Sequence, residues 1–159
     1  MFRIGQGFDS HRTCPGRPLV VGGVTIPCEF GLDGHSDADV LLHALADALL
    51  GALALGDIGQ WFPPNDPRYQ GADSAEFLRR ILAHEAFRDW QIANVDCTLF
   101  AERPAFSPWN RPIREFLARL LDCGVEQVSL KAKTNEGLDS IGAGAAMAAS
   151  AIVLLMRRR

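Results

Sequence analysis

The spacing of apolar residues switches along the chain between the two-residue period of strands and the 3.6-residue period of helices. Strands are predicted over 2–13, 17–27, 90–102 and 126–133, and helices over 36–53, 73–87 and 107–124. Strands and helices are interleaved, but the first two strands are separated only by the turn Cys-Pro-Gly, which favours a hairpin-like pair. We therefore expect an α+β fold in which helices pack on one face of a mixed sheet.

The length and the absence of linkers indicate one domain. No segment rich in Gly, Ser or Pro divides the 159 residues, so we expect a single domain over 1–159. The C-terminal segment 142–158 is the ambiguous element. Its alanines favour a helix, whereas the run Ala-Ile-Val-Leu-Leu suits a buried strand.

Charge and composition exclude several functional classes. The net charge is −3, which argues against a nucleic-acid surface. The sequence has no uncharged apolar run of 18 residues and no signal-peptide pattern at its N-terminus, so we expect neither a membrane span nor export. The four cysteines are scattered without a C-x-x-C pair, which predicts free thiols and a cytoplasmic protein.

The stretch IGQGFDSHRT places two unusual residues in a predicted strand. Asp9 and His11 are two residues apart, so their side chains share one face of the strand and Ser10 points to the other. Neither residue type favours a strand. The pair is either a solvent-facing edge pair or two thirds of a metal site.

His43 is the candidate third ligand. It lies within the predicted helix, four residues after Asp39 and four before Asp47, so the three form a stripe. This stripe is either a surface ladder of ion pairs or a metal ligand with carboxylates supporting it. Two imidazoles and one carboxylate leave a position open on tetrahedral zinc, and the same set also fits non-haem iron.

Several further segments favour a phosphorylated ligand. Ser36 and Asp39 form a capping box at the start of the helix, where free N–H groups suit phosphate, but the box leaves His35 unexplained. The only two lysines, Lys131 and Lys133, share one face of a predicted strand, as edge protection or as an anion-binding pair. Separately these signals are weak, and each has a plain structural alternative. Together they favour a phosphorylated or diphosphorylated small molecule.

Two loops add polar groups that suit the same ligand. The irregular segment 57–66 is long for a loop in a compact domain, and such loops are usually functional or disordered. Thr134, Asn135 and Glu136 follow the strand 126–133, either as an ordinary turn or as a phosphate and magnesium site.

The motifs IGQGFDSH, GHSDADVLLHALADALLGALALGDIGQWFPPNDP, GADS, NVDCTLFAERP and LKAKTNEGL occur in this order over essentially the whole chain. In these motifs and their order, the chain resembles the 2-C-methyl-D-erythritol 2,4-cyclodiphosphate synthase family of the non-mevalonate route to isoprenoid precursors. The combination of D-x-H with H-S-D-x-D-x-x-x-H carries the resemblance most specifically.

The resemblance implies a homotrimer with active sites between adjacent subunits, and a cyclising lyase that releases CMP. It implies zinc on Asp9, His11 and His43, magnesium or manganese on Glu136, and catalytic roles for His35 and Thr134 at the phosphates. The implied substrate-binding residues near the metal are Asp9, Ser10, His11, His35 and Ser36, with the erythritol part held by Asp57, Ile58, Gly59, Phe62, Pro63, Pro64, Asn65 and Asp66. The implied nucleotide-binding residues of the neighbouring subunit are Ala101, Glu102, Arg103, Pro104, Ala105, Phe106, Ser107, Lys133, Thr134 and Asn135, and Glu136 joins the implied substrate-binding set next to its metal ion.

The chain departs from the family pattern at three positions. Ala143 and Ala145 replace an Arg and a Glu that many relatives carry near the trimer axis, and Ala105 replaces a lysine of the nucleotide loop. None of these positions is a predicted metal ligand. The resemblance also implies that the last segment is a strand, in spite of its alanines.

Two other functions are compatible with parts of the sequence. A zinc-containing module that binds cytidine nucleotides without catalysis would explain the missing Arg and Glu, but it leaves His35 and Thr134 without a role. An iron-dependent oxygenase would use the same two histidines and carboxylate, although the sequence shows no site for a 2-oxoacid.

Overall fold

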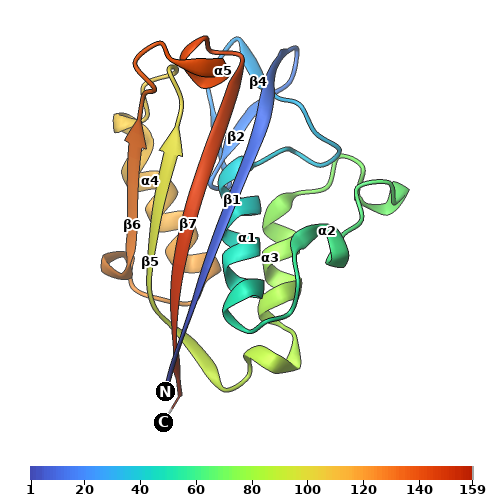
Figure 1. The fold of residues 1–159 in the computed structure, drawn as a ribbon, viewed down its shortest axis with the longest axis vertical. Helices are drawn as coiled ribbons and strands as arrows, with labels where there is room; N and C mark the ends of the chain where they lie inside the picture. The colour runs from blue at the N-terminus through green and yellow to red at the C-terminus, as the bar shows by residue number, and fades with distance from the viewer. Residues whose placement is uncertain (159) are drawn as a thin grey trace.

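A five-stranded sheet in the order β4-β1-β7-β5-β6 forms the centre of the computed structural model, which describes residues 1–158. Its strands are β1 (Phe2–Pro15), β4 (Phe30–Leu32), β5 (Trp90–Phe100), β6 (Val128–Lys133) and β7 (Ala146–Arg157). β5 and β6 run parallel and the other neighbours run antiparallel, so the sheet is mixed, as predicted. Figure 1 shows the four long strands side by side, with both chain ends together at one end of the sheet.

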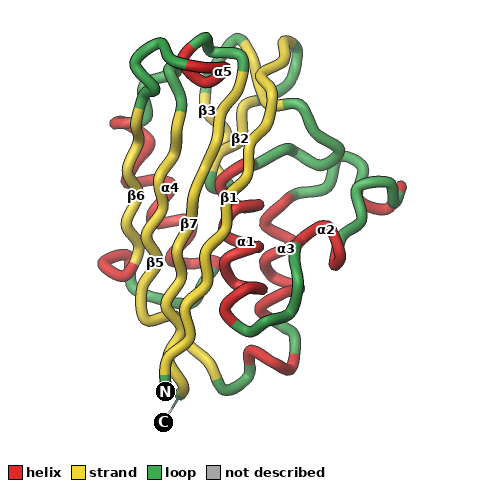
Figure 2. The backbone as a smooth tube through the Cα atoms, viewed as in Figure 1, coloured by secondary structure: helices red, strands yellow, loops and turns green. Residues whose placement is uncertain are grey.

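The longer helices pack on one face of this sheet, which confirms the predicted α+β arrangement. The helices are α1 (Val40–Ala52), α2 (Ile58–Trp61), α3 (Ser74–Leu82), α4 (Asn110–Leu120) and α5 (Asp139–Gly142), of which the short α2 contacts α1 and the short α5 contacts β7. α1 packs on β1 and β7, α4 packs on β6, and α3 contacts both α1 and α4. Figure 2 shows α4 behind the strands and α1 beside β1 with α3 next to it, and the buried apolar side chains of these elements form one cluster.

Three predicted elements are divided into shorter ones in the structure. The segment 17–27 is not one strand but a hairpin of β2 (Leu19–Val21) and β3 (Val24–Ile26), because Gly22 and Gly23 adopt positive φ between them. The predicted pairing of this segment with the first strand is therefore wrong, since β2 and β3 form a sheet of their own and β1 pairs with β4 and β7. The predicted helix 73–87 ends at Leu82 and continues as the 3₁₀ turn Glu85–Phe87. The predicted helix 107–124 opens with the 3₁₀ turn Ser107–Trp109 and ends at Leu120.

The start of α1 is also corrected. Asp39, and not Ser36, is the N-cap, because its carboxylate accepts hydrogen bonds from the N–H groups of Leu41 and Leu42. The same buried carboxylate accepts from Gly22 N–H at 2.9 Å and Gly23 N–H at 2.7 Å. Asp39 therefore fastens the β2–β3 hairpin to the first turn of α1.

Two glycines on β1 allow α1 to lie unusually close to the sheet. A Cβ atom added at Gly5 would lie 1.9 Å from the carbonyl oxygen of Ala48, and one added at Gly7 would lie 2.0 Å from that of Ala44. Alternate residues of a strand share a face, so Asp9 and His11 continue this helix-facing row. The two glycines therefore help to set the separation between β1 and the α1 residues that face it.

The last segment is a strand, which confirms the expectation from the resemblance and overrides its helix propensity. β7 lies between β1 and β5 and pairs with both over most of its length. Ala149 and Ala151 lie on the sheet face that packs against α1, and both are fully buried. Within the described part of the chain, no helix is long and apolar enough to cross a membrane.

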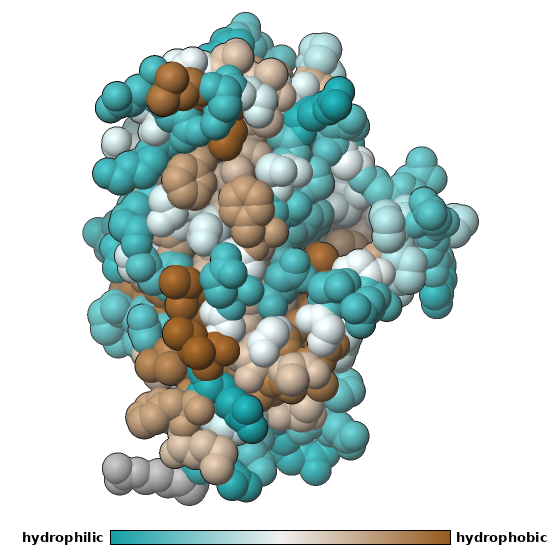
Figure 3. Space-filling view, viewed as in Figure 1, coloured by the Kyte–Doolittle hydropathy of each residue, from teal (hydrophilic) through white to brown (hydrophobic). Residues whose placement is uncertain are grey.

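The other face of the sheet is open and partly apolar. Alternate residues of β1 point to this side, where Ile4 is 69% exposed and Phe8 is 56% exposed. Phe2, also on β1, and Ile152 on the neighbouring β7 are exposed as well. Figure 3 shows apolar side chains gathered over these strands. Several large apolar side chains exposed together on one sheet face are typical of a surface that contacts another protein.

Candidate active site

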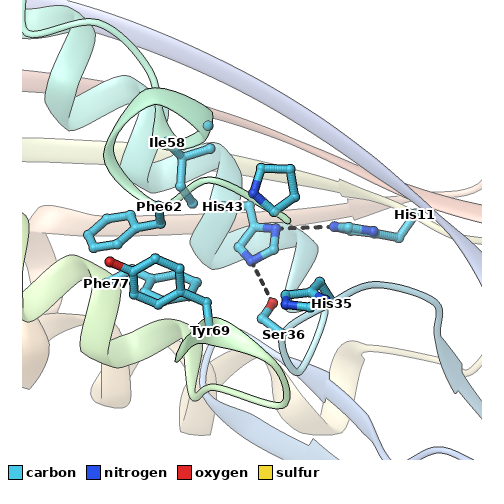
Figure 4. Close-up of a pocket in the computed structure, with 10 residues that line it drawn as sticks. His11, His35, Ser36, His43, Ile58, Phe62, Tyr69 and Phe77 are labelled. Carbon is cyan, nitrogen blue, oxygen red and sulfur yellow. Dashed lines mark hydrogen bonds between the residues drawn. The ribbon is translucent and has the colours of Figure 1, made fainter. Parts of the chain in front are cut away.

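Asp9 and His11 on β1 meet His43 on α1, which confirms the predicted convergence of the three side chains. Asp9 Oδ2 lies 2.8 Å from His11 Nε2 and 3.1 Å from His43 Nδ1, and the two ring nitrogens are 3.1 Å apart. Among residues 1–158, this is the one group of His, Cys, Asp or Glu that could hold a metal ion. Figure 4 shows the His11 and His43 side chains pointing toward each other, with a dashed line between their ring nitrogens.

Hydrogen bonds on the far side of each imidazole determine which nitrogen faces Asp9. His11 Nδ1 lies 2.8 Å from the carbonyl oxygen of Asp33, which can only accept, so Nδ1 carries a proton and Nε2 faces Asp9. His43 is turned the other way. Its Nε2 lies 2.9 Å from Ser74 Oγ and 3.2 Å from Ser36 Oγ, so Nδ1 faces Asp9.

The charges within this group stabilise one another. Burial raises the pKa of Asp9, but the hydrogen bonds and positive charge that His11 and His43 supply when they are protonated outweigh burial and hold that pKa far below its usual range. Burial lowers the pKa of His11, whereas the hydrogen bond and charge of Asp9 raise it by more, so the net shift is upward. Asp9 is therefore an ionised ligand at neutral pH.

The donor set fits a tetrahedral metal ion. Zinc bonds of about 2.0–2.2 Å at tetrahedral angles place two ligand atoms about 3.4 Å apart. The three distances here are 2.8, 3.1 and 3.1 Å, so an expansion of a few tenths of an ångström would accommodate the ion. One carboxylate oxygen and two imidazole nitrogens leave a fourth position for another ligand.

A cavity of about 220 Å³ opens next to these ligands and has two chemically different sides. His11, His35, Ser36 and His43 form its polar side. The apolar side is formed by Ile58, Gly59, Phe62, Pro64, Tyr69 and Phe77. The aromatic rings on this apolar side pack against one another. Phe62 stacks on Phe77 with ring centres 4.5 Å apart, and Tyr69 contacts both rings edge-on. The cavity can therefore receive a ligand with a charged end and a small carbon skeleton (Figure 4).

Several other residues predicted to bind the substrate make hydrogen bonds within the chain or lie on the other face of the sheet. His35 Nε2 donates to the carbonyl oxygen of Asp66 at 3.2 Å, which fastens the 62–66 loop over the site. The Asp57 carboxylate caps α2 and the Asp66 carboxylate bonds Arg68, so both are engaged within the chain. Ser10 is exposed and belongs to the row of β1 side chains on the opposite face of the sheet.

The predicted nucleotide segments form a second cluster, at the ends of β5 and β6. Glu102 Oε1 accepts from Asn135 N–H at 2.7 Å, and Ala101 N–H donates to the carbonyl oxygen of Lys133 at 2.9 Å. Residues 101–107 and 133–136 therefore lie together. They do not line the metal-side cavity of the described chain, because β7 and β5 separate β1 from β6 in the sheet.

The prediction that Asp39 and Asp47 pair with His43 or support it is wrong. Asp39 is occupied by backbone N–H groups, and Asp47 accepts from Ile58 N–H at 2.7 Å. The groups that bond the outer nitrogen of His43 are Ser36 and Ser74. Sequence reasoning missed Ser74, and it also missed the cavity residues Tyr69 and Phe77. The motif GADS and the single tyrosine of the chain were the available signals.

The cysteines take no part in this chemistry. All four are free thiols. Burial raises the pKa of Cys97 to about 12 and also raises that of Cys123, so both are poor nucleophiles. Lys131 lies on the edge strand β6, where it pairs with Asp96, as expected for edge protection.

Comparison with known proteins gives one consistent family. The profile of the YgbB family matches residues 2–156. The 2-C-methyl-D-erythritol 2,4-cyclodiphosphate synthase of Geobacillus kaustophilus (strain HTA426) is 53% identical over 157 residues, covering 99% of this chain and 99% of that protein. The enzyme of the same name from Moorella thermoacetica (strain ATCC 39073 / JCM 9320) is 54% identical over 156 residues, covering 98% and 96%. A solved CDP-bound structure of a synthase of this name superposes with a TM-score of 0.88 at 41% identity, covering 97% of this chain and 100% of that one.

Proposed function

Because this chain belongs to the YgbB family, we propose that it is a 2-C-methyl-D-erythritol 2,4-cyclodiphosphate synthase of the non-mevalonate isoprenoid pathway. The substrate is 4-diphosphocytidyl-2-C-methyl-D-erythritol 2-phosphate. An oxygen of its 2-phosphate attacks the β-phosphorus, the bond from that phosphorus to the bridging oxygen breaks, and CMP leaves with that oxygen. The products are the cyclic diphosphate and CMP, so the enzyme is a phosphorus–oxygen lyase.

The observation that carries this proposal is the convergence of Asp9, His11 and His43 beside a cavity with a polar and an apolar side. These residues would hold zinc, and Glu136 would hold magnesium or manganese together with the substrate phosphates. The two ions would supply the positive field that a chain of net charge −3 lacks for a multiply charged phosphate substrate. Phosphoryl transfer depends mainly on this neutralisation and on alignment of the reacting atoms.

The chain's own residues bind and orient the substrate in this scheme. Ser36 and His35 stand at the polar side of the cavity, where the Ser36 hydroxyl can donate a hydrogen bond to a phosphate oxygen. The His35 Nε2–H, which donates to the carbonyl oxygen of Asp66 in the structure, would turn from that carbonyl to the phosphate. The apolar side, with Ile58 and Phe62, excludes water around the methylerythritol carbons. Both reacting groups belong to one molecule, so a bound folded conformation removes much of the entropic barrier. Thr134 would donate to the phosphates from the second cluster.

We further propose that the active site is completed in a homotrimer. Within one chain, the segments 101–107 and 133–136 lie apart from the metal-side cavity, so a neighbouring copy would supply them. The open sheet face with Phe2, Ile4 and Phe8 would be covered in the same assembly. Near the trimer axis, Ala143 and Ala145 would replace the charged residues that many relatives carry there. Each chain would form a single domain over residues 1–159, and the protein would be cytoplasmic.

Release of CMP from the purified protein tests the reaction. We expect CMP and the cyclic diphosphate in equal amounts, complete loss of both after chelation, and recovery on adding zinc and magnesium. Binding of cytidine diphosphate without any metal-dependent CMP would favour the non-catalytic module instead. Iron rather than zinc in the purified protein would favour oxygenase chemistry.

A further inference from the structure

The outer nitrogen of His43 contacts Ser74, and Ser74 in turn contacts Asp37. We infer that this pair positions His43 by holding a proton on its Nε2, which leaves the Nδ1 lone pair free for the metal ion. The inference rests on the proposed function in one respect only, namely that the ion bound by His43 is the one used in catalysis.

The contacts form a short chain of hydrogen bonds. His43 Nε2 lies 2.9 Å from Ser74 Oγ, and Ser74 Oγ donates to Asp37 Oδ1 in a very short hydrogen bond. The backbone N–H of Ser74 donates to Asp37 Oδ2 at 3.1 Å, so one carboxylate holds both polar groups of the serine. The Ser74 residue is fully buried.

The direction of each bond follows from what each group can do. A carboxylate has acceptors only, so the single hydroxyl proton of Ser74 goes to Asp37. Ser74 Oγ must then accept from His43, and the proton lies on Nε2. The neutral imidazole carries one proton, so Nδ1 is a free acceptor facing Asp9, 3.1 Å away. Without this constraint, Asp9 would attract the proton to Nδ1 and block it as a ligand atom.

Ser36 has a secondary place in this arrangement. Its Oγ lies 3.2 Å from His43 Nε2 and 3.4 Å from Ser74 Oγ, and it accepts from Ala38 N–H. It is therefore a longer contact without a carboxylate behind it. Ser36 alone does not decide the proton position, since its hydroxyl could donate to Nε2 as well as accept from it.

The fold holds the pair in place through the start of α3. Ser74 is the first residue of α3, which packs against α1, and Phe77 one turn later lies beside the His43 ring with centres 6.3 Å apart. Asp37 is fixed in turn, since its N–H donates to the carbonyl oxygen of Ala72 at 3.0 Å. His11 differs, because a backbone carbonyl sets its tautomer and no side-chain substitution can remove it.

The test uses the full-length protein, with nitrogen NMR of the His43 ring in the metal-free state and titration with zinc against a chromophoric chelator. In Asp37→Asn the new amide can donate to Ser74 Oγ, so the serine proton can turn toward His43. We expect the proton to move from Nε2 to Nδ1 and zinc affinity to fall by about 10–100-fold, as for loss of an outer-shell partner. Ser74→Ala should loosen the same preference and weaken zinc binding in the same direction.

Asp73→Asn is the matched control. It removes the same charge from the cap of the same helix, where Asp73 accepts from Ala75 N–H, but it does not contact His43. We expect it to lower thermal stability slightly and to leave the tautomer and zinc affinity unchanged. If Asp37→Asn keeps the proton on Nε2 and binds zinc within twofold of the unmodified protein, the inference is wrong.

Failure of the proposed function has a different signature. An unmodified protein that binds no zinc, or that binds it and releases no CMP, would contradict the proposed chemistry. The ring nitrogens of His43 would still report in the metal-free protein whether Ser74 and Asp37 hold its proton.

Discussion

Substitution of Gly7 by alanine tests whether the close approach of α1 to β1 builds the metal site. Gly7 lies two residues before Asp9 on the same face of β1, and the carbonyl oxygen of Ala44 sits directly above it. Ala44 follows His43 in α1. A methyl group at position 7 therefore acts on the helix beside one ligand while leaving all three ligands chemically unchanged.

The expected displacement follows from the distances. The added Cβ would lie 2.0 Å from Ala44 O, and real contacts of this kind are not shorter than 3.0 Å, so α1 must retreat by about 1 Å. A metal site tolerates deviations of about 0.2 Å in its ligand distances. We expect zinc affinity to fall by about 10–100-fold, comparable to loss of an outer-shell partner. The overpacked interface should lose about 1–3 kcal/mol of stability.

The assay combines zinc titration with thermal denaturation. For a chain of this length, the loss of stability corresponds to a decrease in Tm of about 2–12 °C. Gly51→Ala is the matched control on the same helix, because the nearest atom to its added Cβ is Gln6 O at 3.9 Å. Alanine is favoured over glycine in a helix, so this control should keep its zinc affinity and its stability, or gain up to about 1 kcal/mol.

Gly5→Ala separates stability from site geometry. Its Cβ would lie 1.9 Å from Ala48 O, more than one helical turn beyond His43. We expect a similar loss of stability with a smaller loss of zinc affinity. A Gly7→Ala protein that binds zinc and melts like the unmodified one would refute the argument that this contact sets the position of His43.

Four further outcomes are expected. His43→Ala should abolish CMP release while leaving a folded trimer by light scattering; collapse to monomers would show a structural role instead. Glu136→Gln should mainly raise the magnesium concentration needed for half-maximal activity, because it removes one charge and keeps the shape; an unchanged magnesium requirement would count against its role. Burial lowers the pKa of His11, but Asp9 raises it by more, so the net pKa lies above the ordinary value of 6.5. Protons compete with zinc for this imidazole, so zinc titrations at a series of pH values should show the affinity falling as the pH drops through that raised pKa. Asp39→Ala removes the acceptor of four backbone N–H groups and should lower the free energy of unfolding by about 2–4 kcal/mol in urea, and an unchanged midpoint would contradict that role.

Local pattern was sufficient for much of the fold and for the metal ligands. Alternation predicted β1, β5 and β6, and the helical spacing of leucines predicted α1. The D-x-H pattern worked because a strand places residues 9 and 11 on one face whatever surrounds it. The sequence also offered His43 as the third ligand, but only as one of two interpretations, since a single helical histidine carries no information about the strand it faces; the resemblance assigned it to the metal site.

The remaining features depend on contacts between distant segments. Asp39 takes the capping role expected of Ser36 because the glycine turn of another hairpin also donates to it. β7 is a strand because β1 and β5 bond it on both sides, which alanine propensity cannot reveal. Ser74 reaches His43 only after α3 packs on α1. Such pairings follow from tertiary packing rather than from spacing along the chain.

Anomalous diffraction at the zinc edge, from crystals grown with zinc and cytidine diphosphate, tests the central claim most directly. We predict one strong peak about 2.0–2.2 Å from Asp9 Oδ2, His11 Nε2 and His43 Nδ1, with its fourth position occupied by a non-protein oxygen. A peak elsewhere, or an ion at these atoms closed off by a fourth protein ligand, would contradict it.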